Sequence, residues 1–92
     1  MLFVYSAIDR HDKSELRAKN NAAHVKYVYE YGLKVVHAGP LVCDDGVSPI
    51  GTLIIVDALN REAVQEFIDN DPYVIAGLFN QISLIAWDKK TR

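Results

Sequence analysis

The alternation of β-forming runs with two helical segments is the feature that most restricts how this 92-residue chain folds. The clearest run is residues 51–56, whose unbroken apolar character predicts a strand that is buried on both faces. Residues 2–7 predict a first strand and residues 81–87 a last one, because aromatic and β-branched side chains suit a pleated sheet. Residues 34–41 predict another strand, which Pro40 places at an edge of the sheet or at a bulge.

A long helix is expected between the first two strands, starting after a cap at Asp12 or Ser14 and ending at Gly32. Its residues form two neighbouring stripes at helical spacing, and the more apolar stripe is expected to face the core. The apolar stripe consists of Ala18, Ala22, Val25 and Tyr29, and the more polar one of Arg17, Asn21, His24 and Val28. His24 is therefore expected at the border of the buried face.

A second helix is expected from a cap at Asn60 to Asp69, followed by an Asp-Pro step. Its core side is expected to consist of Ala63, Val64, Phe67 and Ile68. Pro72 disfavours helical geometry at Asp71, so the incoming helix stops there. Pro72 then suits the first position of a new helical turn, with Asp71 as its cap. A capping role alone would explain this carboxylate, and a functional role requires a partner such as His24.

The order strand, helix, strand, strand, helix, strand predicts a ferredoxin-like α+β sandwich, formed by a single domain over residues 1–92. Two helices cover only one face of a four-stranded antiparallel sheet. Large apolar residues remain for the other face, either Phe3 and Tyr5 or Ile85 and Trp87. A second copy of the chain would cover such a face most simply. We therefore expect a homodimer joined face to face, a dimeric α/β-barrel-type assembly.

Charge and composition argue against several classes of partner. The net charge is -2 and the basic residues form no cluster, which disfavours nucleic-acid binding. The apolar runs are far shorter than the roughly 20 residues that span a bilayer, so we expect no membrane partner. The start of the chain lacks the pattern of a signal peptide, and Cys43 is the single cysteine, which excludes an internal disulfide. A cytoplasmic location is expected.

Four motifs, in this order and at these spacings, resemble the YciI-like (YCII-related domain) family over nearly the whole chain. They are Ala23-His24, Ala38-Gly39-Pro40-Leu41, residues 51–56, and Asn70-Asp71-Pro72-Tyr73 followed by Ala76-Gly77-Leu78. The resemblance implies a ferredoxin-like dimer with a pocket near the sheet, in which His24 and Asp71 are the suspected catalytic pair. It also implies an activity of the dehydrochlorinase type, which is an elimination. Family members often carry an arginine where this chain has Asn21, and Arg17, about one helical turn away, is a candidate to replace it.

A histidine beside a carboxylate suits proton transfer, because its ordinary pKa of about 6.5 lets it take and return a proton near neutrality. The carboxylate fixes the ring tautomer and stabilises the imidazolium. No nucleophile is apparent, since Asp44 and Asp45 disfavour the thiolate of Cys43. The pair therefore favours isomerisation, tautomerisation or elimination next to a carbonyl. The histidines lack metal-ligand spacing, and we expect neither a metal nor a cofactor.

Further residues are candidates for binding a small-molecule substrate. Ser48, Gly51 and Thr52 could form a pocket rim with free backbone N–H groups. Tyr73 could line the mouth of the pocket, although an aromatic residue after a helix break also suits plain packing. The remaining candidates are Arg17 and Asn21 on the first helix.

Three functions remain open at this point. The chain could be a cofactor-independent enzyme in which His24 is the general acid/base and Asp71 orients it. It could instead be a non-catalytic dimer that binds a small ligand or a partner chain through the same cleft. In the third case, the pair only ties the first helix to the end of the second. The fold cannot decide among them, because ferredoxin-like domains host many functions.

Overall fold

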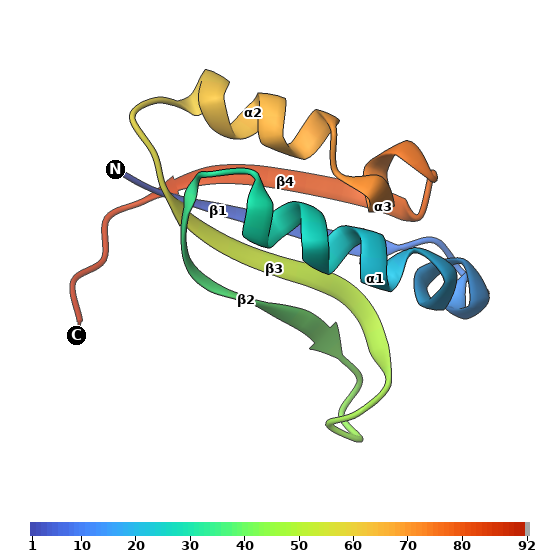
Figure 1. The fold of residues 1–92 in the computed structure, drawn as a ribbon. Coiled ribbons are helices and arrows are strands. Elements are labelled where there is room, and N and C mark those ends of the chain that lie inside the picture. Colours follow the sequence, from blue (N-terminus) through green and yellow to red (C-terminus); the bar gives the residue numbers. More distant parts are fainter. Residues whose placement is uncertain (92) are drawn as a thin grey trace.

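The computed structural model describes residues 1–91 and contains a four-stranded sheet and three helices (Figure 1). In chain order the elements are β1 (Leu2–Asp9), α1 (Ser14–Glu30), β2 (Lys34–Val42), β3 (Pro49–Asp57), α2 (Arg61–Asp69), α3 (Pro72–Ile75) and β4 (Phe79–Trp87). This is the predicted order, with the Asp-Pro step starting the short helix α3. The main difference is that all four strands are longer than expected.

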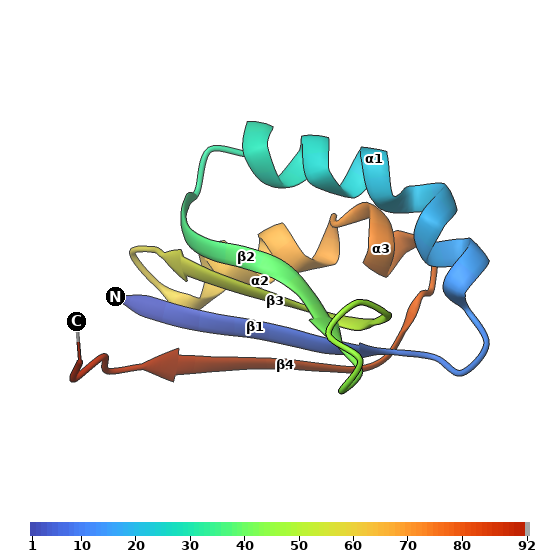
Figure 2. The ribbon, with the colours of Figure 1, turned by 90° about the horizontal axis from the view of Figure 1, so that it is seen from below.

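Each strand of the sheet is antiparallel to its neighbours, in the order β2-β3-β1-β4. β1 and β3 therefore lie in the centre, and β2, which contains Pro40, is an edge strand as predicted. The helices lie over one face of the sheet and leave the other face without helical cover (Figure 2). The ferredoxin-like α+β sandwich is confirmed.

The core fills the space between the sheet and the helices. Because side chains alternate along a strand, Phe3, Tyr5 and Ala7 of β1 share the helix-facing side, and all of them are buried. Tyr5 pairs with Ile54 of β3 and with Leu84 of β4, so the neighbouring strands present buried residues on the same side. From α2, the predicted core residues Val64, Phe67 and Ile68 are buried, while Ala63 is half-buried. The Asn60 side chain caps α2 as expected, accepting from the Ala63 N–H at 2.9 Å.

The orientation of α1 differs from the prediction. Its buried residues come from the more polar stripe and are Arg17, His24 and Val28. The apolar stripe, Ala18, Ala22, Val25 and Tyr29, is exposed, with Tyr29 at 84%. The reason is that the polar side chains have partners on other elements of the fold, as described below. The cap also differs, because Lys13 precedes the helix and neither Asp12 nor Ser14 caps it, whereas Gly32 follows its end at φ 101° as expected.

The helix-free face of the sheet is rich in apolar residues. Ile85 pairs with Val4 and Trp87 with Leu2, and these side chains point away from the helices. Ile85 is 62% exposed and Trp87 is 39% exposed. Of the two pairs predicted for this face, Ile85 and Trp87 therefore occupy it, because Phe3 and Tyr5 face the helices. Within residues 1–91, no helix has the length and apolar character needed to cross a membrane.

Candidate functional site

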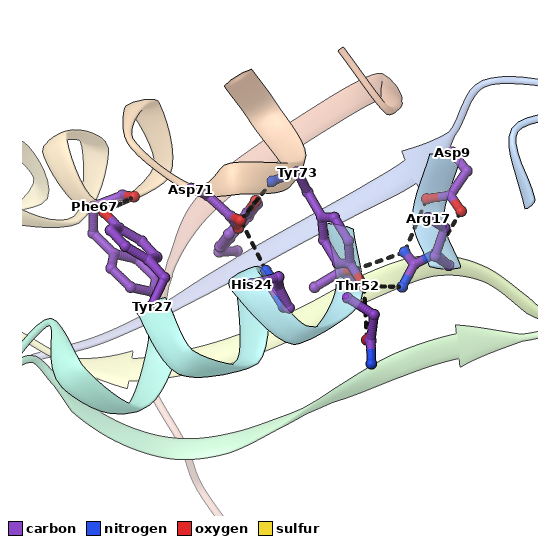
Figure 3. A network of polar contacts seen from close by, with 10 residues as sticks. Asp9, Arg17, His24, Tyr27, Thr52, Phe67, Asp71 and Tyr73 are labelled. Atoms are coloured by element: carbon purple, nitrogen blue, oxygen red, sulfur yellow. Dashed lines mark hydrogen bonds and ion pairs between the residues drawn. The ribbon is translucent and has the colours of Figure 1, made fainter. Parts of the chain in front are cut away.

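The Asp71 side chain is fully buried where the chain turns from α2 into α3. Its Oδ1 accepts a hydrogen bond from the Tyr73 backbone N–H at 2.9 Å, which is the predicted cap of α3. Oδ2 accepts from the Tyr5 hydroxyl of β1 at 2.9 Å, and His24 Nδ1 of α1 lies 2.8 Å from Oδ1. The structure thus brings together the two residues predicted as a pair, which are 47 positions apart in the chain (Figure 3).

This geometry assigns the tautomer of His24. Asp71 already accepts from a backbone N–H and a phenol hydroxyl, and an ionised carboxylate can only accept. Nδ1 of His24 must therefore carry the hydrogen that points at Asp71. In the neutral ring, Nε2 then has a free lone pair. Since Nδ1 is occupied by the buried Asp71 and His24 lines a cavity, Nε2 is the nitrogen available to a ligand.

Tyr73 connects His24 to the other polar residues of the site. Its ring is stacked on the imidazole, with centroids 4.0 Å apart and planes at 16°. Its hydroxyl lies 2.9 Å from Asn21 Oδ1 and 3.5 Å from an Arg17 nitrogen. Arginine can only donate, so the tyrosine oxygen accepts from Arg17 and its hydrogen goes to Asn21. Burial raises the pKa of Tyr73, while the positive charge of Arg17 acts in the opposite direction.

The guanidinium group of Arg17 is held by several partners. It donates to both oxygens of Asp9, at 2.7 and 2.9 Å, and to the Thr52 hydroxyl at 2.9 Å. It also lies over the Tyr73 ring, 4.7 Å from the centroid. Burial alone would lower the pKa of Arg17, but the hydrogen bonds and charge of Asp9 outweigh it and raise that pKa. Arg17 is therefore a neutralised, fixed cation at this site.

A cavity of about 570 Å³ opens beside these residues, between α1 and the β2–β3 end of the sheet. The predicted residues Arg17, Asn21, His24, Thr52 and Tyr73 line it. The rest of the lining is Ser14, Ala18, Val25, Val28, Tyr29, Gly39, Pro40 and Pro49. Its volume and its mixture of apolar walls with a few polar groups are typical of small-molecule sites.

Ser48 and Gly51, which were predicted at the pocket rim, lie outside this lining. Ser48 is exposed in the β2–β3 loop, where its backbone N–H and hydroxyl both bind Asp45. Gly51 is buried against β1, and a Cβ placed there would lie 2.3 Å from the Ala7 carbonyl oxygen. Both residues therefore have a role in the fold of the chain, which the sequence did not reveal. Asp71 also lies behind the lining, so it reaches a ligand only through His24.

Two residues of the network, Tyr5 and Asp9, were not predicted from the sequence as part of the site. Tyr5 is fully buried, and burial together with the Asp71 carboxylate strongly raises its pKa. One signal could have identified it, because an inward-facing tyrosine needs a buried partner for its hydroxyl. Asp9 gave no such signal, since its role depends on Arg17 eight residues later. Within residues 1–91, no group of three or more His, Cys, Asp or Glu side chains is arranged to hold a metal ion.

The family model described as the YCII-related domain matches residues 1–88. Protein YciI of Escherichia coli O6:H1 and protein YciI of Shigella flexneri are each 31% identical to this chain. Both alignments span 97 positions and cover 97% of this chain and 98% of the relative. The chain is also similar to 5-chloro-2-hydroxyhydroquinone dehydrochlorinase (TftG) of Burkholderia phenoliruptrix, solved in complex with 2,5-dihydroxybenzoquinone. That similarity has a TM-score of 0.86 and 31% identity, and it covers 96% of this chain and 94% of that one.

A more distant likeness concerns the fold alone. An antibiotic biosynthesis monooxygenase superposes with a TM-score of 0.63 at 12% identity, over 99% of this chain and 100% of the other. This agrees with the ferredoxin-like topology.

Proposed function

Because the chain belongs to the YCII-related domain family, we propose that it is a small cofactor-independent enzyme in which His24 and Asp71 transfer a proton. One observation carries the proposal, namely the buried Asp71 carboxylate that orients His24 so that Nε2 is available to a cavity. Similarity at 31% identity to a dehydrochlorinase supports a reaction of the elimination type. The substrate is a small organic compound, and the ring compound bound to that relative makes an oxygenated ring a reasonable class.

In the proposed reaction, His24 Nε2 takes a proton from a carbon next to a carbonyl or hydroxyl-bearing carbon of the substrate. The electron pair of the broken C–H bond forms a new C=C bond. In an elimination, the leaving group departs from the neighbouring carbon with the electrons of its own bond. In an isomerisation, the π electrons of the neighbouring C=O bond move onto its oxygen, and the imidazolium then returns the proton to that oxygen or to another carbon of the resulting enolate. Asp71 stabilises the imidazolium while it exists, because their N···O distance is 2.8 Å. After an elimination, the imidazolium loses the proton to water.

We further propose that the chain acts as a homodimer joined through its helix-free sheet face. Support comes from the exposed Ile85 and Trp87 on that face, beside half-buried apolar residues of the central strands. A single chain leaves this apolar surface in water, and a second copy would remove it from water.

A non-catalytic ligand-binding module is the second candidate. The same cavity favours it, because binding needs the shape of the site but no reactive nitrogen. In that case, the His24–Asp71 bond ties α1 to the α2–α3 turn and only shapes the cavity wall.

Proton transfer is tested directly by exchange with solvent. Purified protein is incubated in D₂O with cyclic ketones, enones and hydroxylated rings, and deuterium uptake is followed by NMR. Chloride release from 5-chloro-2-hydroxyhydroquinone is measured in parallel. We expect His24→Gln to abolish exchange and Asp71→Asn to reduce it at least about 100-fold. The matched control is His37→Gln, since His37 is exposed on β2 outside the cavity. Compounds that bind the cavity without any exchange would favour the binding module, and activity in His24→Gln would reject the mechanism.

A further inference from the structure

The cations at the cavity are already neutralised by carboxylates. Among the residues that line it, Arg17 and His24 are the ones that can carry a positive charge. Arg17 is paired with Asp9 through two short hydrogen bonds, and His24 with Asp71. With a neutral imidazole, the four groups sum to one negative charge; with an imidazolium, they sum to zero. An anionic ligand would therefore gain no net attraction, and it would approach the buried carboxylate of Asp71 and the half-buried one of Asp9.

The side-chain amide of Asn21 offers an uncharged hydrogen-bond donor at the cavity. The Tyr73 hydroxyl donates to Asn21 Oδ1. This bond fixes the orientation of the side-chain amide, so that its NH₂ group points away from the Tyr73 hydroxyl. Within residues 1–91, this NH₂ group makes no side-chain or backbone hydrogen bond, and Asn21 lines the cavity at an exposed position. An amide N–H can donate to a carbonyl, hydroxyl or ether oxygen. Unlike a charged donor, it brings no positive charge that would offset the two carboxylates when the ligand is an anion.

The walls of the cavity favour a flat ligand. Pro40 and Pro49 present rigid rings from the β2 and β3 strands, and Gly39 adds no side chain. Val25 and Val28 of α1 provide apolar contact, next to the stacked rings of His24 and Tyr73. Such a lining favours the burial of an apolar ring and offers few polar groups to orient it.

From this charge balance we infer that the cavity selects an uncharged, flat ring compound bearing a hydrogen-bond acceptor, and that Asn21 is the residue that determines this selectivity. The inference rests on the proposed function only in taking this cavity as the ligand site. It narrows the substrate class to neutral ring carbonyl or hydroxyl compounds, and it disfavours ring carboxylates of the same size.

The test uses a pair of probes that differ in charge, 4-hydroxybenzamide and 4-hydroxybenzoate, at neutral pH. Binding to the full chain is measured by NMR titration of the side-chain signals of Asn21, His24 and Tyr73. We expect 4-hydroxybenzamide to bind at least about 10-fold more tightly than 4-hydroxybenzoate. Asn21→Arg should reverse this order by adding an unpaired cation. The matched control is Asn20→Arg, because Asn20 is outside the lining and points about 100° away around the helix, with its amide bonded to the Leu16 carbonyl.

Equal affinities, tighter binding of 4-hydroxybenzoate, or no shift of these signals with either probe would overturn the inference. If Asn21→Arg left the order of the two affinities unchanged, or if Asn20→Arg reversed it as well, Asn21 would not be the residue that determines the selectivity. The outcome is separable from that of the exchange assay. A protein that prefers 4-hydroxybenzamide but exchanges no proton contradicts the proposed function alone. Proton exchange combined with tighter binding of the anion contradicts only this inference.

Discussion

The side chain of Asp71 accepts hydrogen bonds from α1, β1 and its own helix α3, at distances of 2.8 to 2.9 Å. The Asp71 side chain has no exposed surface, so each hydrogen bond that it makes within the protein replaces a hydrogen bond to water. Each of these donors stabilises the carboxylate, because an unpaired buried charge is very costly. The local capping role and the link to His24 therefore belong to one arrangement, and neither excludes the other.

At the residue scale, we expect Tyr5→Phe to change the site without changing the fold. Removing the hydroxyl leaves Asp71 Oδ2 buried without that donor, which should lower the free energy of unfolding by about 1–3 kcal/mol. The carboxylate then has one fewer donor to share, so the His24 Nδ1–H signal should move downfield in the proton NMR spectrum.

Tyr27→Phe is the matched control for that change. It also removes a phenolic hydrogen bond, but that bond is made to the Phe67 carbonyl at 2.7 Å and not to Asp71. It should cost stability and leave the His24 signal in place. If Tyr5→Phe moved that signal no more than Tyr27→Phe does, Tyr5 would be a packing residue and no part of the site.

At the element scale, β1 and β3 approach each other so closely that Gly51 has no room for a side chain. A Cβ there would meet the Ala7 carbonyl oxygen at 2.3 Å, and neither backbone can move without disturbing the central strand pair. This explains why a glycine stands at the start of the most apolar strand. The requirement is steric, since Gly51 does not adopt a positive φ.

Gly51→Ala should therefore lower the free energy of unfolding by about 1–3 kcal/mol. For a domain of this size, each kcal/mol lowers Tm by roughly 4–8 °C. Gly39→Ala on β2 is the matched control, because a Cβ at that position meets no atom within 4 Å. Urea unfolding of both variants checks the difference. Equal stabilities would mean that β1 and β3 separate at little cost.

Contacts between elements also explain the orientation of α1. The helix buries its more polar stripe because Arg17 binds Asp9 and Thr52, and His24 binds Asp71. Satisfied polar groups remove the penalty of burial, and Val28 joins the core beside them. The apolar stripe is left facing solvent, where part of it forms one wall of the cavity.

For the whole molecule, the exposed apolar sheet face predicts self-association. Ile85→Asp would place a charge on that face, on the edge strand β4, and should convert the proposed dimer to a monomer, because a buried unpaired carboxylate is strongly unfavourable. Size-exclusion chromatography with light scattering measures the mass. Ile75→Asp is the control, since Ile75 is 71% exposed but lies on α3, over the opposite face of the sheet. A wild-type protein that is monomeric at high concentration would contradict the dimer.

Buried phenols predict how stability depends on pH. Burial raises the pKa of Tyr27 to about 12, with nearby acidic groups adding to the effect, and burial and Asp71 raise that of Tyr5 further. A raised folded-state pKa means that the unfolded chain, with a tyrosine pKa of about 10, releases its proton first. Stability should therefore be constant up to about pH 9 and fall steadily above about pH 10.

Urea unfolding across that alkaline range measures the effect. Tyr27→Phe should show a smaller fall than the wild type, because one raised phenol has been removed. Tyr29→Phe should behave like the wild type, since Tyr29 is 84% exposed. A stability that stays flat to about pH 12 would show that these phenols are not ionised by unfolding.

Much of this protein was determined by its sequence alone. The order of elements, the strand at residues 51–56, the core side of α2 and the Asp71 cap follow from periodicity and backbone chemistry, which act over a few residues. The resemblance to the family added the pairing of His24 with Asp71. Tertiary structure alone decided which stripe of α1 is buried, the roles of Tyr5 and Asp9, and the place of Gly51 outside the cavity. The physical reason is that burying a polar side chain depends on a partner from another element, whereas burying an apolar one depends mainly on its own surface.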